Sequence, residues 1–520
     1  MATEGTVVHG APASSQVSDK GLKKGAISYV SNIVIGVAST APAYSLAATL
    51  GFIVALNGVG THAPAVLIVS FIPILLIAVA YKYLNRADPD AGTTFAWTTR
   101  AFGPSLGWLN GWAIFLADVL VMASLSDIAA IYTFKLFGFT ELGESEAAIV
   151  IAAIIWIAIM TWICWRGIEL SAAIQRALLT AEVIILAIFA VVALVKVYGG
   201  SAPHGSIEPQ ADWFNPFSMS FGDLLPAVLL GVFIYWGWDS GVAVNEESED
   251  PANGPGKAAV ISTFLLLVIY LLVSTGAQAF HGVGFLANEN NAEDVLNALG
   301  KPVFGGGVVG SVLAKLLIIS VLTSASASTQ TTILPTARTT LSMAHWKAIH
   351  SVLGKVHKTY LTPDVSTIAM GLISIAITVP LLLVSESVLS DSITALGFPV
   401  CFYYGFTGLA CVVYYRRELF KSAKNFFLLG LVPLAGCIML FGVFVKAVIY
   451  YGETKNVESA PVAGITLPLW FGLGGMVIGV ILMLVSRPFF KEFFSRKTET
   501  APPGILEQPA VQTIPAPVDF

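Results

Sequence analysis

The 520-residue sequence contains very little charge, because only 11% of its residues are Asp, Glu, Lys or Arg. An average soluble domain carries roughly 25%. Hydrophobic residues make up 56% of the chain, and the mean hydropathy is +0.79. This composition argues against a water-soluble globular protein and for one integral membrane body. The net charge of −5 also provides no basic field for nucleic acid.

Motifs for disulfides, metals and catalysis are missing as well. The four cysteines lie in apolar stretches without metal-ligand spacing and are expected to be small core residues: Cys164, Cys401, Cys411 and Cys437. There is no Walker A lysine motif, no Gly-x-Ser-x-Gly elbow and no His-Glu-x-x-His, and the seven histidines do not cluster within apolar runs. We therefore expect no enzyme activity, no cofactor and no metal site.

Long apolar runs are what the sequence does have. A helix needs about 20 apolar residues to cross the hydrocarbon core of a bilayer. Twelve runs meet this requirement, near residues 26–53, 63–82, 105–131, 147–165, 174–197, 222–244, 257–280, 308–343, 365–384, 391–415, 426–451 and 465–486. The predicted fold is therefore an all-α integral membrane protein with both termini on one side.

The distribution of basic residues predicts which side that is. With a cytoplasmic N-terminus, 21 of the 27 Lys and Arg residues fall inside, five fall outside and Lys315 lies within a span. Basic residues concentrate in cytoplasmic loops, so both termini are predicted to be cytoplasmic. We expect disordered tails at 1–22 and 491–520, and a permease domain at 23–490 with a core at 23–415 and two extra helices at 426–486.

Two of the spans are interrupted in mid-membrane. The first contains Gly36 and Pro42, and the sixth has three glycines within residues 231–241. Spans one and six open two consecutive sets of five, and an odd number of crossings inverts the second set. Matched interruptions in inverted halves are typical of a transporter with its substrate site near the midplane. Ordinary kinks closed by neighbouring Ser or Thr are the alternative.

The chemistry of broken helices indicates the kind of ligand. Half-helix N-termini offer unpaired amides and partial positive charge to an anion, whereas unwound carbonyls and half-helix C-termini suit a cation. A free α-amino acid carries both groups on one carbon. The sequence therefore favours an amino acid as the small-molecule substrate.

Four segments resemble the amino acid–polyamine–organocation (APC) permeases. The segment 89–112 has the Pro, Gly, Ala-Phe-Gly-Pro and Gly-Trp pattern of that family, and 236–258 contains Trp-Gly-Trp-Asp, Asn-Glu-Glu, Asp-Pro and Lys-Ala. The segments 336–344 and 353–363 are similar to the family's exit from span eight and its loop into span nine. The resemblance covers roughly 20–490 and implies a LeuT-like fold, with a 5+5 inverted-repeat core and broken helices one and six.

The resemblance and the breaks together suggest the substrate-binding residues. They are Ala38, Ser39, Thr40, Ala41, Asp118, Trp236, Gly237, Trp238 and Asp239. Many family members have a Gly-Ser-Gly-type stretch at the first break, whose amides hold a substrate carboxylate. Here Pro42 has no amide, so the carboxylate cradle is expected to shift or to use the hydroxyls of Ser39 and Thr40. Whether the substrate has a carboxylate stays open.

Ionisable residues within spans are costly and point to function. Asp239 beside the second break is expected to attract an ammonium group or to carry a coupling proton, or else to cap the following half-helix. Asp118 in span three would meet a cationic substrate or form a structural pair. Trp236, within the break, is a candidate gate.

Coupling and gating residues complete the predictions. Lys315 would replace a coupling cation, or would pair with Asp118 or Glu182, or reach the outer face. Ser324 and Ser328 of span eight would contribute to a sodium site or would simply pack. Three residues at the inner ends of spans six and eight would form an inner-gate ion pair, or a solvated charge run: Glu246, Glu247 and Arg338.

The predicted function is secondary transport of amino acids across the plasma membrane, coupled to protons or to exchange. A polyamine or other organic-cation transporter of the same fold is the alternative, because Asp118 and Asp239 favour a cation. A membrane sensor that binds without transporting is a third class, disfavoured because the short, Pro-rich tails provide no folded output domain.

Overall fold

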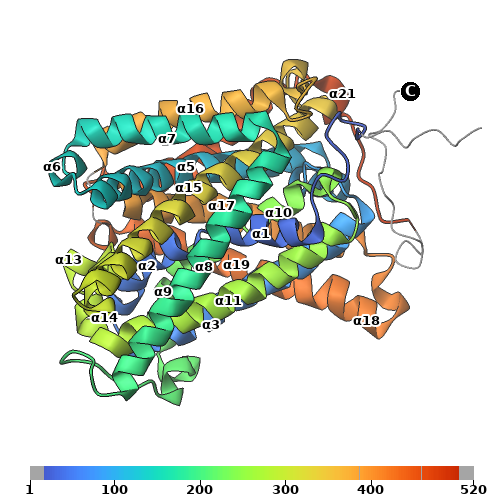
Figure 1. Ribbon diagram of the computed structural model, residues 1–520. Coiled ribbons are helices and arrows are strands. Elements are labelled where there is room, and N and C mark those ends of the chain that lie inside the picture. Colours follow the sequence, from blue (N-terminus) through green and yellow to red (C-terminus); the bar gives the residue numbers. More distant parts are fainter. Residues whose placement is uncertain (1–16, 386, 458, 503–520) are drawn as a thin grey trace, which may run out of the picture.

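The computed structural model describes residues 17–385, 387–457 and 459–502. These residues form helices, with no β-structure beyond isolated bridges (Figure 1). The main helices are α1 (Tyr29–Ser39), α2 (Pro42–Ala55), α3 (Ala63–Ala87), α4 (Thr94–Phe102), α5 (Pro104–Phe137), α7 (Glu146–Arg166), α8 (Ile168–Tyr198), α9 (Phe221–Ile234), α10 (Ser240–Ala243), α11 (Gly254–His281), α14 (Val295–Phe304), α15 (Val308–His345), α16 (Asp364–Val384), α17 (Val388–Tyr414), α19 (Val432–Gly452), α20 (Gly475–Ser486) and α21 (Lys491–Phe494).

Eleven helical stretches within the described residues are long and apolar enough to cross a membrane. They correspond to eleven of the twelve predicted spans. The remaining prediction, 222–244, coincides with α9 and α10, and α9 alone is a shorter apolar helix of 14 residues. The all-α membrane fold is thus confirmed, with span six divided into pieces that fall below the length of a full crossing.

Both predicted interruptions are present. The first span ends as α1 at Ser39 and restarts as α2 at Pro42, with Ala41 between them at φ 47°. The sixth ends as α9 at Ile234 and restarts as α10 at Ser240, with Gly237 at φ 114°. Proline is well suited to the first turn of a helix, where its missing amide costs no hydrogen bond, and glycine accepts positive φ without strain. The sequence thus produces each break through a different residue.

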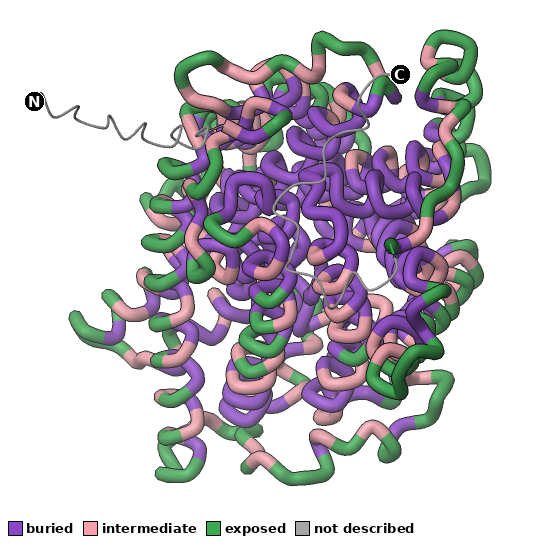
Figure 2. The backbone as a smooth tube through the Cα atoms, turned by 90° about the vertical axis from the view of Figure 1, so that its right-hand side faces the viewer, coloured by how far each residue is buried: buried purple, intermediate pink, exposed green. Residues whose placement is uncertain are grey.

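Buried residues gather in the middle of the bundle (Figure 2), and they include most residues of the two broken spans. The long helix α5 packs against α15 and α17, and α3 packs against α11. Helices at the periphery expose large apolar side chains to their surroundings, among them Ile151, Ile155, Ile159, Val477, Ile481 and Leu484. An apolar exterior of this extent suits lipid rather than water.

The terminal segments are more structured than the sequence predicts. Lys20 and Leu22, which fall in the predicted tail 1–22, are buried, and α21 in the predicted tail 491–520 buries Phe493. The ring of Phe493 stacks on Phe95 with centroids 5.7 Å apart. The predicted tails are therefore shorter in the structure, because each contains apolar or charged side chains with partners in the helical body. The remainder, 1–16 and 503–520, lies outside the described residues.

Candidate functional site

The first break is closed by its own hydroxyl groups. The Thr40 hydroxyl donates to the carbonyl of Val37 at 2.7 Å, and the Ser45 hydroxyl donates to the carbonyl of Thr40 at 2.6 Å. The amide of Ala41 donates to the carbonyl of Ala38 at 3.1 Å. The backbone groups released by the break are therefore largely paired within the protein, as a bilayer requires.

The N-terminus of half-helix α2 holds a carboxylate that belongs to the protein itself. Pro42 has no amide, and the amide of Ala43 donates to Glu182 Oε1 of α8 at 2.8 Å. The Ser324 hydroxyl of α15 donates to the same oxygen at 2.8 Å and accepts the Tyr44 amide at 3.3 Å. The sequence predicts that the carboxylate cradle shifts, or uses the hydroxyls of Ser39 and Thr40, because Pro42 has no amide. In this conformation the next two amides, of Ala43 and Tyr44, already have acceptors in the protein.

The two breaks meet each other. The hydroxyls of Ser39 and Ser240 are 2.8 Å apart, and a Cβ on Gly237 would lie 2.9 Å from the carbonyl oxygen of Ser39. Ser328 of α15 donates its hydroxyl to that same carbonyl at 2.8 Å. The candidates Ser39, Gly237 and Ser328 are thus brought to one point, where α15 also presents Ser324 to α2.

Asp239 lies inside a cluster of tyrosine hydroxyls. Tyr404 donates to Oδ1 at 2.8 Å, while Tyr403 and Tyr81 donate to Oδ2 at 3.1 and 3.4 Å. The side chain makes no capping bond to α10. Helix capping is therefore not its role in this structure, and the three tyrosines, from α3 and α17, were not apparent from the sequence.

Two tryptophans of the second break complete the walls of this cluster. Trp236 Nε1 donates to the Tyr403 hydroxyl at 2.6 Å. The ring of Trp238 stacks on Tyr404 with centroids 5.3 Å apart and meets Tyr81 edge-on at 4.9 Å. A carboxylate surrounded by aromatic faces is chemically suited to an organic cation, which gains from both.

Asp118 is the second buried carboxylate of this region. The Thr336 hydroxyl of α15 donates to its Oδ2, and its charge interacts with that of Asp239. Within the described part of the chain, neither carboxylate forms an ion pair with Lys, Arg or His. The bundle centre therefore brings two carboxyl groups together without a Lys, Arg or His partner among the described residues.

Lys315 does not supply that cation. Its side chain is exposed on the third turn of α15, and no ion pair joins it to Asp118 or Glu182 within the described residues. The predicted pairing with either carboxylate is wrong for this conformation. Lys315 also lies nine residues before Ser324, the residue of α15 that contacts the first break. A helix rises about 1.5 Å per residue, so Lys315 is distant from the break.

Of the three residues predicted to form an ion pair at the ends of spans six and eight, Arg338 and Glu247 do so. Arg338 donates to both carboxylate oxygens of Glu247 at 2.5 and 2.9 Å, and both side chains are almost fully buried. Glu246 instead accepts from Lys20 at 2.6 Å and from the Ala91 amide at 2.9 Å. Glu246 thus pairs with Lys20 of the N-terminal segment, whereas Arg338 pairs with Glu247.

Lys20 also connects this gate to the loop after α3. Its ammonium lies 2.8 Å from Asp90, which accepts from Ser342 and Trp346 of the α15 end at 2.6 and 3.0 Å. Burial opposes the charge on Lys20, but the carboxylates of Asp90 and Glu246 overcome it and raise the lysine pKa. Lys20 in turn holds the pKa of Asp90 below its usual range despite burial. Lys20 and Asp90 thus remain charged near neutral pH.

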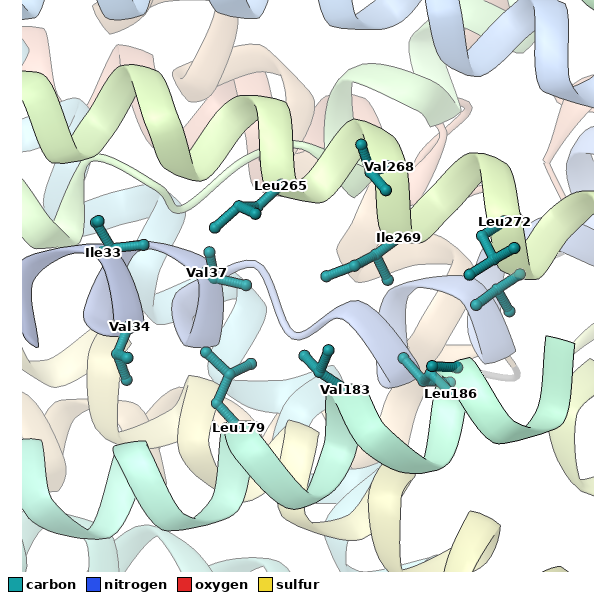
Figure 3. A pocket seen from close by; sticks show the side chains of 12 residues that line it. Ile33, Val34, Val37, Leu179, Val183, Leu186, Leu265, Val268, Ile269 and Leu272 are labelled. Carbon is teal, nitrogen blue, oxygen red and sulfur yellow. The ribbon is translucent and has the colours of Figure 1, made fainter. Parts of the chain in front are cut away.

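A cavity of about 330 Å³ lies between α1, α8 and α11 beside the first break (Figure 3). Only Ile, Val, Leu and Ala side chains line it, including Val37, Leu179, Val183 and Leu265. It offers no polar group to a charged ligand. The candidate substrate site is therefore the closed, polar region where the breaks meet, and not this cavity.

Comparison with known proteins gives a family match and several relatives. The family model described as amino acid permease matches residues 26–471. An arginine/ornithine antiporter of Lactococcus lactis subsp. cremoris is 24% identical over 305 residues, 55% of this chain and 59% of the relative. A branched-chain amino acid permease of Bacillus subtilis is 23% identical over 343 residues, 62% and 69% respectively.

A human large neutral amino acids transporter small subunit 2 is 23% identical over 334 residues, which cover 64% of this chain and 58% of the relative. The matched part thus spans about three fifths of the arginine/ornithine antiporter and of the human protein. The names of these relatives describe transporters of different amino acids.

Proposed function

Because the chain belongs to the amino acid permease family, whose members are transporters and not enzymes, we propose that it moves amino acids across the plasma membrane by alternating access. Both termini are proposed to be cytoplasmic, from the excess of basic residues on that side. The inner network of Lys20, Glu246, Glu247 and Arg338 then closes the cytoplasmic end of the path.

The observation that carries the substrate class is the pair Asp118 and Asp239. Both are buried beside the meeting point of the breaks, and within the described residues neither has a cationic partner. A buried carboxylate is stabilised by a cation that accompanies it. We therefore propose that the substrate is an amino acid with a cationic side chain, and the arginine/ornithine antiporters among the relatives agree with this choice.

An organic cation without a carboxylate is the second candidate. It is favoured by one feature of the first break: the Ala43 and Tyr44 amides of α2, which would hold a substrate carboxylate, already have acceptors in the protein. Polyamines and decarboxylated amino acids belong to this class. The two candidates differ in one chemical group and can be compared directly.

Uptake by purified protein in liposomes distinguishes the candidates. We expect labelled arginine or ornithine to accumulate, and leucine to accumulate less, because leucine has no side-chain charge for Asp118 and Asp239. A pH gradient is expected to change the rate. Uptake of putrescine with no uptake of any amino acid would show that the second candidate is correct and the first is wrong.

The same vesicles also test the coupling ion and the direction of exchange. Replacing external sodium with choline should leave uptake unchanged if protons or exchange drive it. Loss of uptake in choline would contradict proton coupling and would return Ser324 and Ser328 to the role of sodium ligands. Loading the vesicles with unlabelled substrate shows whether the carrier exchanges.

Asp239→Asn tests the tyrosine cluster. The amide keeps one acceptor oxygen for the tyrosine hydroxyls. It loses the negative charge that would attract a cationic substrate. A hydrogen bond to a charged group contributes about 1.5–3 kcal/mol, so uptake should fall about tenfold or more at subsaturating substrate. Asp250→Asn is the control, since Asp250 is exposed and bonds only to nearby Asn253. Equal uptake by the two variants would remove Asp239 from the site.

A further inference from the structure

We propose that Glu182 is a proton-dependent competitor for the substrate carboxylate: when ionised it occupies the N-terminus of half-helix α2, and when protonated it releases that place to the substrate. This inference rests on the proposed function and adds a residue, a proton and a selectivity rule to it. It depends on three features of the described residues around the first break.

The first feature is that Glu182 already binds where a substrate carboxylate is expected to bind. Its Oε1 accepts the Ala43 amide at 2.8 Å, at the start of a 14-residue half-helix. The helix dipole and the first-turn amides favour an anion at that end. Because Pro42 contributes no amide, Ala43 and Tyr44 are the first donors available there, and Glu182 and Ser324 take them.

The second feature is the incomplete pairing of the Glu182 side chain. It is fully buried, and while Oε1 accepts from Ala43 and Ser324, Oε2 has no partner. A neutral carboxyl fits this arrangement, with its carbonyl oxygen accepting both bonds and its proton on Oε2. An ionised carboxylate is held more firmly by the amide but has one bare, desolvated oxygen.

The third feature is the absence of a fixed counter-charge among the described residues. In α11, the titratable group near Glu182 is Tyr270, which is neutral, and its hydroxyl donates to the Ile234 carbonyl at 2.7 Å. The helices α1 and α2 have no charged side chain. Charged groups of other helices packed on α8 are exposed or paired elsewhere: Glu146, Arg166, Lys301, Lys315 and Arg338. Toward α1 and α11, α8 lines the apolar cavity, which has no charged side chain (Figure 3).

These features link proton binding to carboxylate binding. The negative charge of ionised Glu182 repels a substrate carboxylate. Ionised Glu182 also retains the hydrogen bond from the Ala43 amide, which the substrate carboxylate would need. Protonation removes the charge and weakens the bond to Ala43, so the substrate carboxylate can take the amide while the proton remains on Glu182. A substrate without a carboxylate has no such competition and needs no proton.

Two probes that differ only in the carboxylate test this directly. Arginine and agmatine share the guanidinium side chain, and neither changes charge between about pH 5.5 and 7.5. In the purified wild-type protein, we expect the arginine dissociation constant to fall by up to about tenfold per pH unit on acidification, the limit for one linked proton. Agmatine should not show this dependence, and any titration of Asp118 or Asp239 would affect both probes alike.

Glu182→Gln keeps a carbonyl oxygen for Ala43 and Ser324 but cannot bind or release a proton. In this variant the pH dependence of arginine binding should become that of agmatine, while Asp250→Asn should behave as wild type. The proposal is overturned if the two probes respond to pH identically in the wild type, or if Glu182→Gln retains the difference. The wild-type comparison stands even if the variant does not fold.

A measurement without any substrate separates this inference from the proposed function. Infrared difference spectra between acidic and neutral pH should show a protonated carboxyl band that is absent in Glu182→Gln and present in Asp250→Asn. If neither probe binds, the proposed function fails on its own. If the wild-type band is unchanged in Glu182→Gln, Glu182 does not titrate and the inference is wrong.

Discussion

Arg338→Ala should destabilise the protein by about 3–5 kcal/mol, the usual effect of removing one partner of a buried ion pair. Arg338 donates two hydrogen bonds to Glu247, and the exposed fractions of the two side chains are only 1% and 0%. Without the guanidinium, the buried Glu247 carboxylate has neither water nor a cation beside it. The thermal unfolding midpoint of the detergent-purified protein should fall clearly.

Two further variants make that result interpretable. Arg417→Ala removes an exposed arginine at the end of α17 and should leave the midpoint unchanged. Replacing the pair by apolar residues, Arg338→Met with Glu247→Leu, should recover much of the loss because no charge is then stranded. A single Arg338→Ala variant as stable as the wild type would mean that the pair does not hold the gate together.

Gly237→Ala is expected to lower transport at least tenfold. Gly237 lies at φ 114°, a backbone region that residues with a Cβ rarely adopt. Holding alanine there costs about 1–3 kcal/mol. The added Cβ would also lie 2.9 Å from the Ser39 carbonyl oxygen. Relief requires the two breaks to separate, which would disturb the Ser39–Ser240 contact and the position of Asp239. Initial rates of uptake into liposomes measure the effect, and a factor of ten corresponds to about 1.4 kcal/mol.

Gly442→Ala provides a matched control for that substitution. Gly442 lies within helix α19 on the exposed side of the bundle, with ordinary helical backbone and open space where a Cβ would be added. Its replacement should leave uptake unchanged. If Gly237→Ala transports as well as Gly442→Ala, the close approach of the two breaks is not required for function.

The spans and the breaks could be predicted from the sequence because each depends on a short stretch of neighbouring residues and not on distant contacts. Length and hydropathy define a crossing, and Pro42 or Gly237 interrupts a helix wherever that helix lies. The sixth span shows the same local control. Its predicted break at the glycines divides the apolar run into α9 and α10.

The partners within the site could not be predicted, because they are contributed by distant segments. Asp239 is 164 and 165 residues from Tyr403 and Tyr404, and no local pattern reports which face of α17 those hydroxyls occupy. Glu182 gave a weaker signal. It is the only acidic residue of the predicted span 174–197, and a first break that has lost an amide to Pro42 makes a substitute ligand more valuable.

The gate network also has an order in time. Lys20 leaves the ribosome 226 residues before its partner Glu246, and Arg338 follows its partner Glu247 by 91 residues. Nascent chains supply residues strictly in sequence, at about 5–20 per second. The network of Lys20, Glu246, Glu247 and Arg338 therefore cannot form completely until Arg338, in the second half of α15, has been synthesised.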